Sequence, residues 1–298
     1  MFDSWPLFAV FVCAIVYTIG ALCAKRALAG GATVWQVNFA ANMAMSVLYL
    51  PFWLGADWAM VLTQGYKPIL AAAAFFTGQL FTFAALRKGD VSVATPLLGA
   101  KVIFVAFITS FLFGEAVGMK WWLAAAVCTC GIFLVTGSQR RTEGWTRHSG
   151  KTAAYSLTAA MAYALTDTLL QHWSVEVGVV SFVAVMFSFV GIFTCALYVP
   201  AVGWRKLVVS PAVARRALIL GALLLGAQNL VMALAIRFSG DATAVNIVYS
   251  SRCVLSVVLA WATARWLGSR EASLPRPVLL LRLAGALLLA GAILMVLV

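Results

Sequence analysis

Two basic residues stand deep inside apolar runs of the sequence, where a positive charge is unfavourable. Lys101 lies eleven residues after Asp90. Arg252 lies at the same distance after Asp241. At the rise of an α-helix, each cation lies roughly 16 Å from the start of its predicted helix, too deep for its side chain to extend to water. We therefore expect both cations to bind substrate or to form structural ion pairs, and we expect the two aspartates to cap their helices.

Two amides also hold matching places in the sequence. Gln79 lies eight residues before Arg87. Asn229 lies eight residues before Arg237. A buried amide in an apolar helix bonds either a neighbouring helix or a ligand. Both amides are therefore candidates for substrate binding and for helix contact.

Three tyrosines are candidates for lining a binding site. Tyr17 and Tyr163 hold near-equivalent places in their apolar runs, deep enough for their hydroxyls to reach a ligand. Tyr249 lies three residues before Arg252 and shares its predicted helix with Asn246. A tyrosine near the headgroups would instead belong to the aromatic belt of the membrane interface, so both roles stay open for Tyr17 and Tyr163.

One apolar segment carries a polar stripe. Asn38, Asn42, Ser46 and Tyr49 recur at spacings of four, four and three, which places them on one face of a helix. Such a face lines a cavity or contacts another helix. We include Asn42 among the candidate binding residues.

Asp167 is the carboxylate that the sequence places well inside an apolar helix. A buried carboxylate favours its protonated form unless it is paired. This makes Asp167 a candidate site for proton coupling, and equally a candidate partner for Lys101 or Arg252.

The sequence indicates neither an enzyme nor a metal site, and we expect no cofactor. Either would need a nucleophile with a base, or a set of metal ligands. His148 and His172 lie far apart, and no His-Glu-x-x-His motif occurs. Gly150-Lys151 lacks the glycine spacing of a phosphate-binding loop. Six cysteines fall inside apolar runs, where they are expected to pack as small hydrophobic residues: Cys13, Cys23, Cys128, Cys130, Cys195 and Cys253.

The composition requires lipid around the chain. Of its 298 residues 64% are hydrophobic and 10% are charged, and the mean hydropathy is +1.00. Soluble domains carry about 25% charged residues. We expect an all-α integral membrane protein, and we expect residues 1–6 to lead into the first helix rather than to begin a cleaved signal peptide.

The apolar runs are long enough for ten transmembrane helices at roughly 20 residues each. Their predicted ranges are 6–24, 33–54, 68–86, 91–113, 121–136, 153–173, 179–199, 217–236, 242–267 and 278–298.

The two halves of the chain repeat. Leu48–Pro51 and Leu197–Pro200 share the pattern Leu-Tyr-x-Pro at the ends of the second and seventh predicted helices. Because each unit has five helices, the second copy enters the membrane from the opposite side. We expect two inverted five-helix repeats, 1–138 and 152–298, joined by a basic cytoplasmic linker at 139–151.

The net charge of +12 is explained by topology rather than by nucleic-acid binding. Sixteen of the 21 basic residues fall on one side of the predicted membrane, and Lys67, Lys120 and Arg237 fall on the other. The positive-inside rule makes the sixteen-residue side cytoplasmic. We therefore expect both termini outside.

The chain resembles the EamA-type transporters of the drug/metabolite transporter superfamily over its whole length. The resemblance is carried by the Gly89-Asp90 turn, by Pro96, by Phe113-Gly114-Glu115 and by the glycine-rich fifth and tenth helices. The second copy departs from the pattern, with Ile247 in place of the proline and Arg265-Trp266 in place of Gly-Glu. Members of the superfamily are drawn with both termini cytoplasmic, opposite to the orientation that the charges predict.

The resemblance implies a multi-pass secondary transporter of the plasma (inner) membrane, working by alternating access around a site between the repeats. Together with the two deep cations, it predicts export of a small anionic or zwitterionic metabolite, with proton or counter-substrate coupling. The alternative on the same fold is a flippase for a lipid-linked sugar or lipid phosphate. An intramembrane enzyme is the least favoured reading, and membrane lipid is the only other expected partner.

Overall fold

The computed structural model describes residues 5–88, 97–116, 118–143, 147–203, 212–252, 255 and 276–297. These residues form α-helices, two short 3-10 helices and connecting turns, and no strand occurs among them. The elements of the first half are α1 (Trp5–Ala29), α2 (Val34–Tyr49), η1 (Leu50–Gly55), α3 (Trp58–Gln64), α4 (Tyr66–Lys88), η2 (Leu98–Ala100), α6 (Lys101–Leu112) and α7 (Met119–Glu143). Those of the second half are α8 (Arg147–Val177), α9 (Val179–Val202), α10 (Ala212–Ser239), α11 (Ala242–Tyr249) and α13 (Arg276–Leu297).

Four helices within this part of the chain are long and apolar enough to cross a membrane: Trp5–Leu28, Val34–Gly55, Val179–Tyr198 and Ala212–Ser239. Two shorter apolar helices cover Leu98–Leu112 and Met119–Leu134. Phe8, Leu54 and Phe111 are among many large apolar side chains that face outward. An outward apolar surface needs lipid around it, so the chain is a multi-pass membrane protein.

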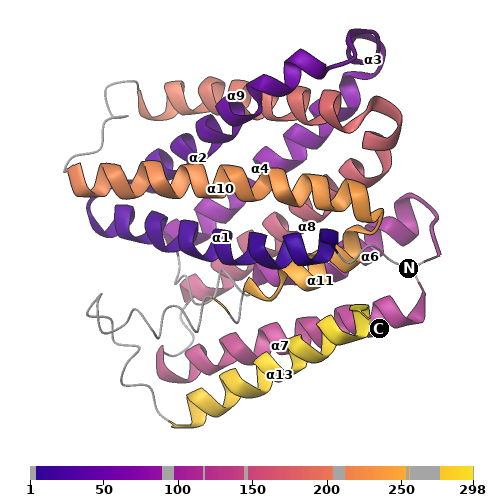
Figure 1. Cartoon of the computed structure of the whole chain (residues 1–298). Helices are drawn as coiled ribbons and strands as arrows, with labels where there is room; N and C mark the ends of the chain where they lie inside the picture. Colours follow the sequence, from indigo (N-terminus) through magenta and orange to yellow (C-terminus); the bar gives the residue numbers. More distant parts are fainter. Residues whose placement is uncertain are drawn as a thin grey trace.

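Pairs of helices from the two halves of the chain make the most extensive contacts. The largest join α1 to α10, α7 to α13, and α4 to α8. Figure 1 shows α7 and α13 side by side, and it places the two chain ends at the same side of the bundle. We call this side the terminal end and the other side the loop end.

Glycines allow these helices to approach closely. A Cβ atom on Gly131 of α7 would lie 2.9 Å from the carbonyl oxygen of Gly285 in α13. A Cβ on Gly78 of α4 would lie 2.8 Å from the ring of Tyr163 in α8. At such crossings small residues let the two helix backbones pack directly against each other. This close packing is one of the contributions that hold helices together in lipid.

Local hydrogen bonds set several helix starts. Thr33 caps α2 in a capping box with Gln36, in which each side chain accepts from the other residue's main-chain N–H. Asp57 caps α3, a short helix that the apolar pattern did not predict. Its seven residues are too few to span a bilayer.

The predicted linker at 139–151 is largely helical. α7 continues to Glu143 and α8 begins at Arg147, so only residues 144–146, which lie outside the described part, separate them. The apolar pattern ends where a helix leaves lipid, whereas main-chain hydrogen bonds continue into water. Most of the predicted helix 242–267 also lies outside the described residues, as do Asp90, Pro96 and Arg265-Trp266.

Candidate functional site

Lys101, Asp167 and Asn246 form a polar cluster where three helices meet. Lys101 is the first residue of α6, and its Nζ lies 2.6 Å from Oδ2 of Asp167 in α8. Asn246 of α11 donates through Nδ2 to the same Oδ2 over 2.7 Å. The side chains of Lys101 and Asp167 are only 12% and 11% exposed, so this is a buried ion pair. Of the two roles expected for Lys101, substrate binding and a structural ion pair, the ion pair is therefore present, and Asp167 is its partner.

Arg252 lies between two tyrosine rings. Its guanidinium carbon lies 4.7 Å from the ring centre of Tyr17 and 4.4 Å from that of Tyr249, within the range of cation–π attraction. The two rings meet edge to face at 5.8 Å. The Tyr249 hydroxyl donates to Oε1 of Gln228 over 2.9 Å, and Cys13 donates to the Gln228 carbonyl over 3.0 Å. These contacts from α1, α10 and α11 hold the arginine in place.

The two cations have matching aromatic neighbours. The Nζ of Lys101 lies 5.8 Å from the ring centre of Tyr163, the near-equivalent of Tyr17. Each cation therefore contacts a tyrosine of the other half of the chain. Tyr163 also accepts a hydrogen bond from Thr82 over 3.3 Å.

Both cations directly follow an interruption of their helix. Before Lys101, residues 98–100 form the 3-10 turn η2 rather than an α-helix. Before Arg252, α11 ends at Tyr249 and residues 250 and 251 form a turn. Gly99 leaves room for Ile132 of α7, because a Cβ at residue 99 would lie 2.4 Å from the end of the Ile132 side chain. Short 3-10 segments within a helix often mark functional positions.

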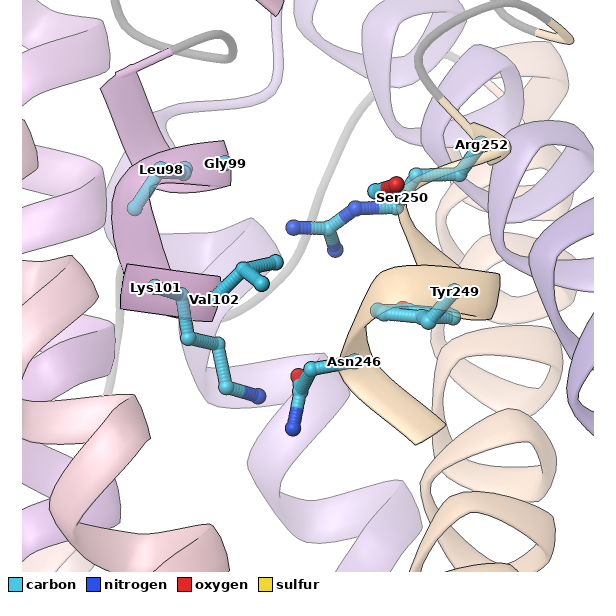
Figure 2. Close-up of a pocket in the computed structure, with 8 residues that line it drawn as sticks. All are labelled: Leu98, Gly99, Lys101, Val102, Asn246, Tyr249, Ser250 and Arg252. Carbon is cyan, nitrogen blue, oxygen red and sulfur yellow. The ribbon is translucent and has the colours of Figure 1, made fainter. Parts of the chain in front are cut away.

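A cavity of about 10 Å³ lies between these two interruptions. Figure 2 shows residues of η2 and α6 on one side, and Asn246, Tyr249 and Arg252 on the other, with the guanidinium between them. This volume is about that of one water molecule. A cavity of this volume cannot hold a metabolite, so binding requires the helices around it to separate.

Asp241 caps α11, as the sequence predicted. Its carboxylate accepts from the main-chain N–H of Ala244 over 2.9 Å. Burial raises the pKa of this carboxyl above its ordinary value. The first main-chain N–H of α11, that of Ala242, donates to Gln171 of α8 over 2.8 Å, so two side chains fix the start of the helix that carries Asn246.

The polar stripe of α2 contacts α9. Asn42 is fully buried, and its Nδ2 donates to Asn38 and to Thr194, each over 2.9 Å. Tyr49 stacks on Phe187 with ring centres 4.0 Å apart. Of the two roles expected for this polar face, lining a cavity and contacting a helix, the structure shows the helix contact.

The two symmetric amides lie away from the cavity. Asn229 of α10 donates to its own helix at Leu225 over 2.8 Å and to the sulfur of Met45 over 3.5 Å. Gln79 is buried in α4, next to Gly78, on which the Tyr163 ring packs. The structure thus brings Lys101, Arg252, Tyr17, Tyr163, Tyr249 and Asp167 together, and places Asn42, Asn229 and Gln79 outside the residues that line the cavity.

Two participants were not selected from the sequence. Asn246 bonds Asp167, and Gln228 bonds Tyr249. For Asn246 a signal existed, because it lies three residues before Tyr249 and so shares its helical face. For Gln228 the neighbouring Asn229 was the better match to the repeat, so the sequence pattern selected Asn229 alone.

Two pairs of side chains meet at the terminal end, one an ion pair and one a histidine–carboxylate contact. Lys67 at the start of α4 pairs with Glu176 near the end of α8. His172 of α8 lies 3.0 Å from Glu115 and stacks on Phe113, with ring centres 3.6 Å apart. Both glutamates are about half exposed, whereas Lys67 and His172 are largely buried, so each contact has one side open to the surface.

An apolar groove of about 340 Å³ lies between α6 and α8. Phe107, Phe111, Met161 and Leu165 line it, and Phe111 is 73% exposed. The groove therefore opens toward the lipid, on the same two helices that carry Lys101 and Asp167.

Comparisons with known proteins give a family for the first half. Residues 4–137 match the EamA-like transporter family. An "Uncharacterized transporter" of Archaeoglobus fulgidus is 23% identical over 161 residues, which cover 52% of this chain and 55% of that protein. The alignment thus spans about half the length of that relative.

Other similarities are to a flippase subunit and to a solved structure. The "Probable 4-amino-4-deoxy-L-arabinose-phosphoundecaprenol flippase subunit ArnE" of Proteus mirabilis is 27% identical over 129 residues, covering 43% of this chain and 95% of that protein. A crystal structure superimposes with a TM-score of 0.75 over 98% of this chain and 96% of its own, at 14% identity. At that identity the superposition shows the fold alone.

Proposed function

Because residues 4–137 match the EamA-like transporter family, we propose that the whole chain is a secondary transporter that exports a small anionic or zwitterionic metabolite by alternating access. One observation carries this proposal: two cations, Lys101 at the start of α6 and Arg252 just after α11, line the same small cavity. An anion held there would pair with the Arg252 guanidinium, whose planar fork suits a carboxylate or phosphate. We assign the chain no catalytic step.

The pattern of helix contacts supports two inverted repeats. Suppose that the five helices of the first half correspond in order to those of the second half: α1, α2, α4, α6 and α7 to α8, α9, α10, α11 and α13. A two-fold axis relating the halves would then turn the contact between α1 and α10 into the contact between α8 and α4. It maps α2–α9, α6–α11 and α7–α13 onto themselves. All five contacts occur. We therefore propose ten spans arranged as repeats 1–138 and 152–298, with the substrate between them.

The proposed orientation places both termini outside. Arg26 in the last turn of α1, Arg147 at the start of α8 and Arg215 near the start of α10 belong to the loop end. The positive-inside rule makes that end cytoplasmic. A phosphatase that is active only outside the cytoplasm, fused after residue 298, should be active in cells. Activity only from a fusion within residues 144–146 would reverse the orientation.

Transport by the purified protein tests the function. In proteoliposomes loaded with one organic anion, exchange for a labelled external anion should depend on the protein. Lys101→Gln and Arg252→Gln should each abolish it. Lys120→Gln and Arg237→Gln make the same changes near the terminal end and should leave it intact. If both deep variants transport as the unmodified chain does, the site is elsewhere.

We propose proton coupling at Asp167 as the first mechanism to test. Exchange driven by a pH gradient should lose that dependence in Asp167→Asn while uptake down the substrate's own gradient persists. A gradient dependence that survives this change would assign Asp167 to the ion pair alone.

A flippase is the second candidate, because the ArnE relatives are named for a lipid-linked sugar and the lipid-facing groove adjoins the cation site. A headgroup phosphate would bind Arg252 while an acyl or prenyl tail lies along Phe107 and Phe111. Translocation of a fluorescent polyprenyl phosphate across vesicles, reduced by Phe111→Ser, would favour this reading. Exchange of water-soluble anions that Phe111→Ser leaves unchanged would favour the first.

A further inference from the structure

We propose that His172, Phe113 and Glu115 form a proton-binding gate, which closes the terminal side of the cavity while the histidine ring is protonated and opens when the proton leaves. The use of the cavity for transport rests on the proposed function, whereas the gate itself can be tested without a substrate. The gate adds a control by pH that is separate from the proton coupling proposed at Asp167.

Gly114 brings two side chains that follow α6 onto one ring of α8. Its φ of +67° lies in the left-handed region, which glycine adopts without strain. The main-chain N–H of Glu115 donates to the Thr109 carbonyl over 3.4 Å, which holds the turn against the end of α6. The turn therefore presents the face of Phe113 and the carboxylate of Glu115 to the same imidazole, that of His172.

The contacts of His172 depend on whether its ring carries a positive charge. Nδ1 lies 2.8 Å from the Thr168 carbonyl, which can only accept, so Nδ1 carries a hydrogen. In the neutral ring Nε2 would then present a lone pair to the Glu115 carboxylate oxygen 3.0 Å away, whereas in the protonated ring it presents a positive N–H. Phe113 lies nearly parallel to the ring, at 11°, and an aromatic face attracts a cation. Loss of the proton therefore weakens both contacts that hold the turn on α8.

His172 lies between the cavity and the terminal surface. It follows Asp167 by five residues, about 7.5 Å further along α8 toward the terminal end. The side chain of His172 is 15% exposed, while that of Glu115 is 51% exposed and reaches the surface. α6 and α8 come from different halves of the chain, and they are joined at the cavity by the buried ion pair and at the terminal end by this contact. Separating them at the terminal end would open a path to the cavity.

Other acidic and basic groups lie on α8 and on the elements that contact it in this half of the bundle. The described ones are Asp57, Lys67, Lys101, Asp167, Glu176, Arg237 and Asp241. Four of them are joined in the two ion pairs described above. Burial raises the pKa of the Asp241 carboxyl, and the nearby Glu115 charge adds to the rise. The two carboxylates therefore repel each other, which favours opening once His172 loses its charge.

Cys13 can report whether the gate is open. This residue is 1% exposed, and its thiol donates to Gln228, which also accepts from the cavity-lining Tyr249. A water-soluble methanethiosulfonate reagent labels the thiol when water reaches the cavity. Peptide mass spectrometry of the detergent-purified, full-length protein distinguishes Cys13 from the other cysteines. Each variant is compared with the unmodified protein at the same pH, because thiol reactivity itself rises with pH.

At about pH 5, where a histidine is ordinarily charged, His172→Gln and Glu115→Gln should each raise the labelling rate at least about fivefold, as loss of a partly exposed charge contact implies. His148→Gln makes the same change at the start of α8, toward the loop end, and should leave the rate unchanged. His172→Lys keeps a positive charge throughout. The unmodified protein should be labelled as slowly as His172→Lys at about pH 5 and nearly as fast as His172→Gln at about pH 9.

The gate is overturned if His172→Gln leaves the rate unchanged at about pH 5, or if His148→Gln raises it equally. It is also overturned if the ratio between the unmodified protein and His172→Gln does not change with pH. Glu115→Gln keeps the histidine and decides the matter if His172→Gln fails to fold. A pH-dependent gate in a protein that exchanges no anion would contradict the proposed function alone, and anion exchange without this response would contradict the gate alone.

Discussion

Lys101 and Arg252 hold equivalent places in the two halves, and they differ in what surrounds them. Each follows an interruption of its helix and contacts a tyrosine of the other half. Lys101, however, is joined to Asp167 by a buried ion pair, whereas Arg252 lies between two rings. In the proposed repeat, the shared features position the two cations, and the Asp167 carboxylate makes their surroundings differ.

Breaking the ion pair between Lys101 and Asp167 should have the largest effect on stability. Asp167→Asn leaves a buried lysine without its carboxylate, which costs about 3–5 kcal/mol of folding free energy. Lys101→Gln combined with Asp167→Asn removes both charges and should restore most of that loss. Thermal unfolding in detergent measures both. A double variant as unstable as Asp167→Asn would show that Lys101 does not depend on this pair.

The Arg252 side should affect transport more than stability. Arg252→Gln removes the charge that we assign to the substrate and should lower exchange roughly a hundredfold, the effect of about 2.7 kcal/mol. Arg252→Lys keeps the positive charge but loses the planar pair of N–H donors, so its exchange rate should fall between those of the unmodified protein and Arg252→Gln. Equal activity of the lysine and glutamine variants would argue that charge is not what Arg252 supplies.

The contribution of the Tyr249 ring can be distinguished from that of its hydroxyl group by substitution. Tyr249→Phe keeps the cation–π contact and loses the hydrogen bond to Gln228, which should cost about 1 kcal/mol in stability with little change in transport. Tyr249→Leu also removes the ring and should lower transport. The two variants are compared by unfolding and by exchange, and a phenylalanine variant as inactive as leucine would shift the role to the hydroxyl.

The Lys67–Glu176 pair offers a contrast to the buried one, because its carboxylate is half exposed although Lys67 is only 11% exposed. Glu176→Gln breaks the ion pair with Lys67, but Glu176 is half exposed, so the loss should be at most about 1 kcal/mol and should shrink further in high salt. Thermal unfolding at two salt concentrations checks this. A loss comparable to that of Asp167→Asn would mean that burial does not distinguish the two pairs.

Much of the helical framework could be predicted from the sequence, because apolar length and charge placement reflect the bilayer directly. The depth of Lys101 and Arg252 follows from helical rise alone, and the pairing of Tyr17 with Tyr163 follows from the repeat. The extensions of α7 and α8 toward residues 144–146 did not follow, since they are held by main-chain hydrogen bonds that carry no apolar signal.

The orientation of each helix about its own axis was harder to predict. Asn42 and Asn229 are as polar as Asn246, yet they bond Thr194 and Met45 at helix contacts while Asn246 reaches Asp167. In lipid, polar side chains serve helix packing as readily as ligand binding. Only the packed arrangement of the helices tells these roles apart, and for the same reason Asp167 could not be assigned to Lys101 rather than Arg252 from the sequence.

The most direct measurement compares butyrate exchange in proteoliposomes by the unmodified protein, by Lys101→Gln, and by Lys101→Gln with Asp167→Asn. Lys101→Gln leaves the Asp167 carboxylate without its cation beside the bound anion, so exchange should be lost, and the double variant removes that carboxylate and should recover exchange. Recovery would show that the unpaired Asp167 carboxylate is what blocks anion transport in Lys101→Gln. A double variant no more active than Lys101→Gln, although it folds, would contradict that account.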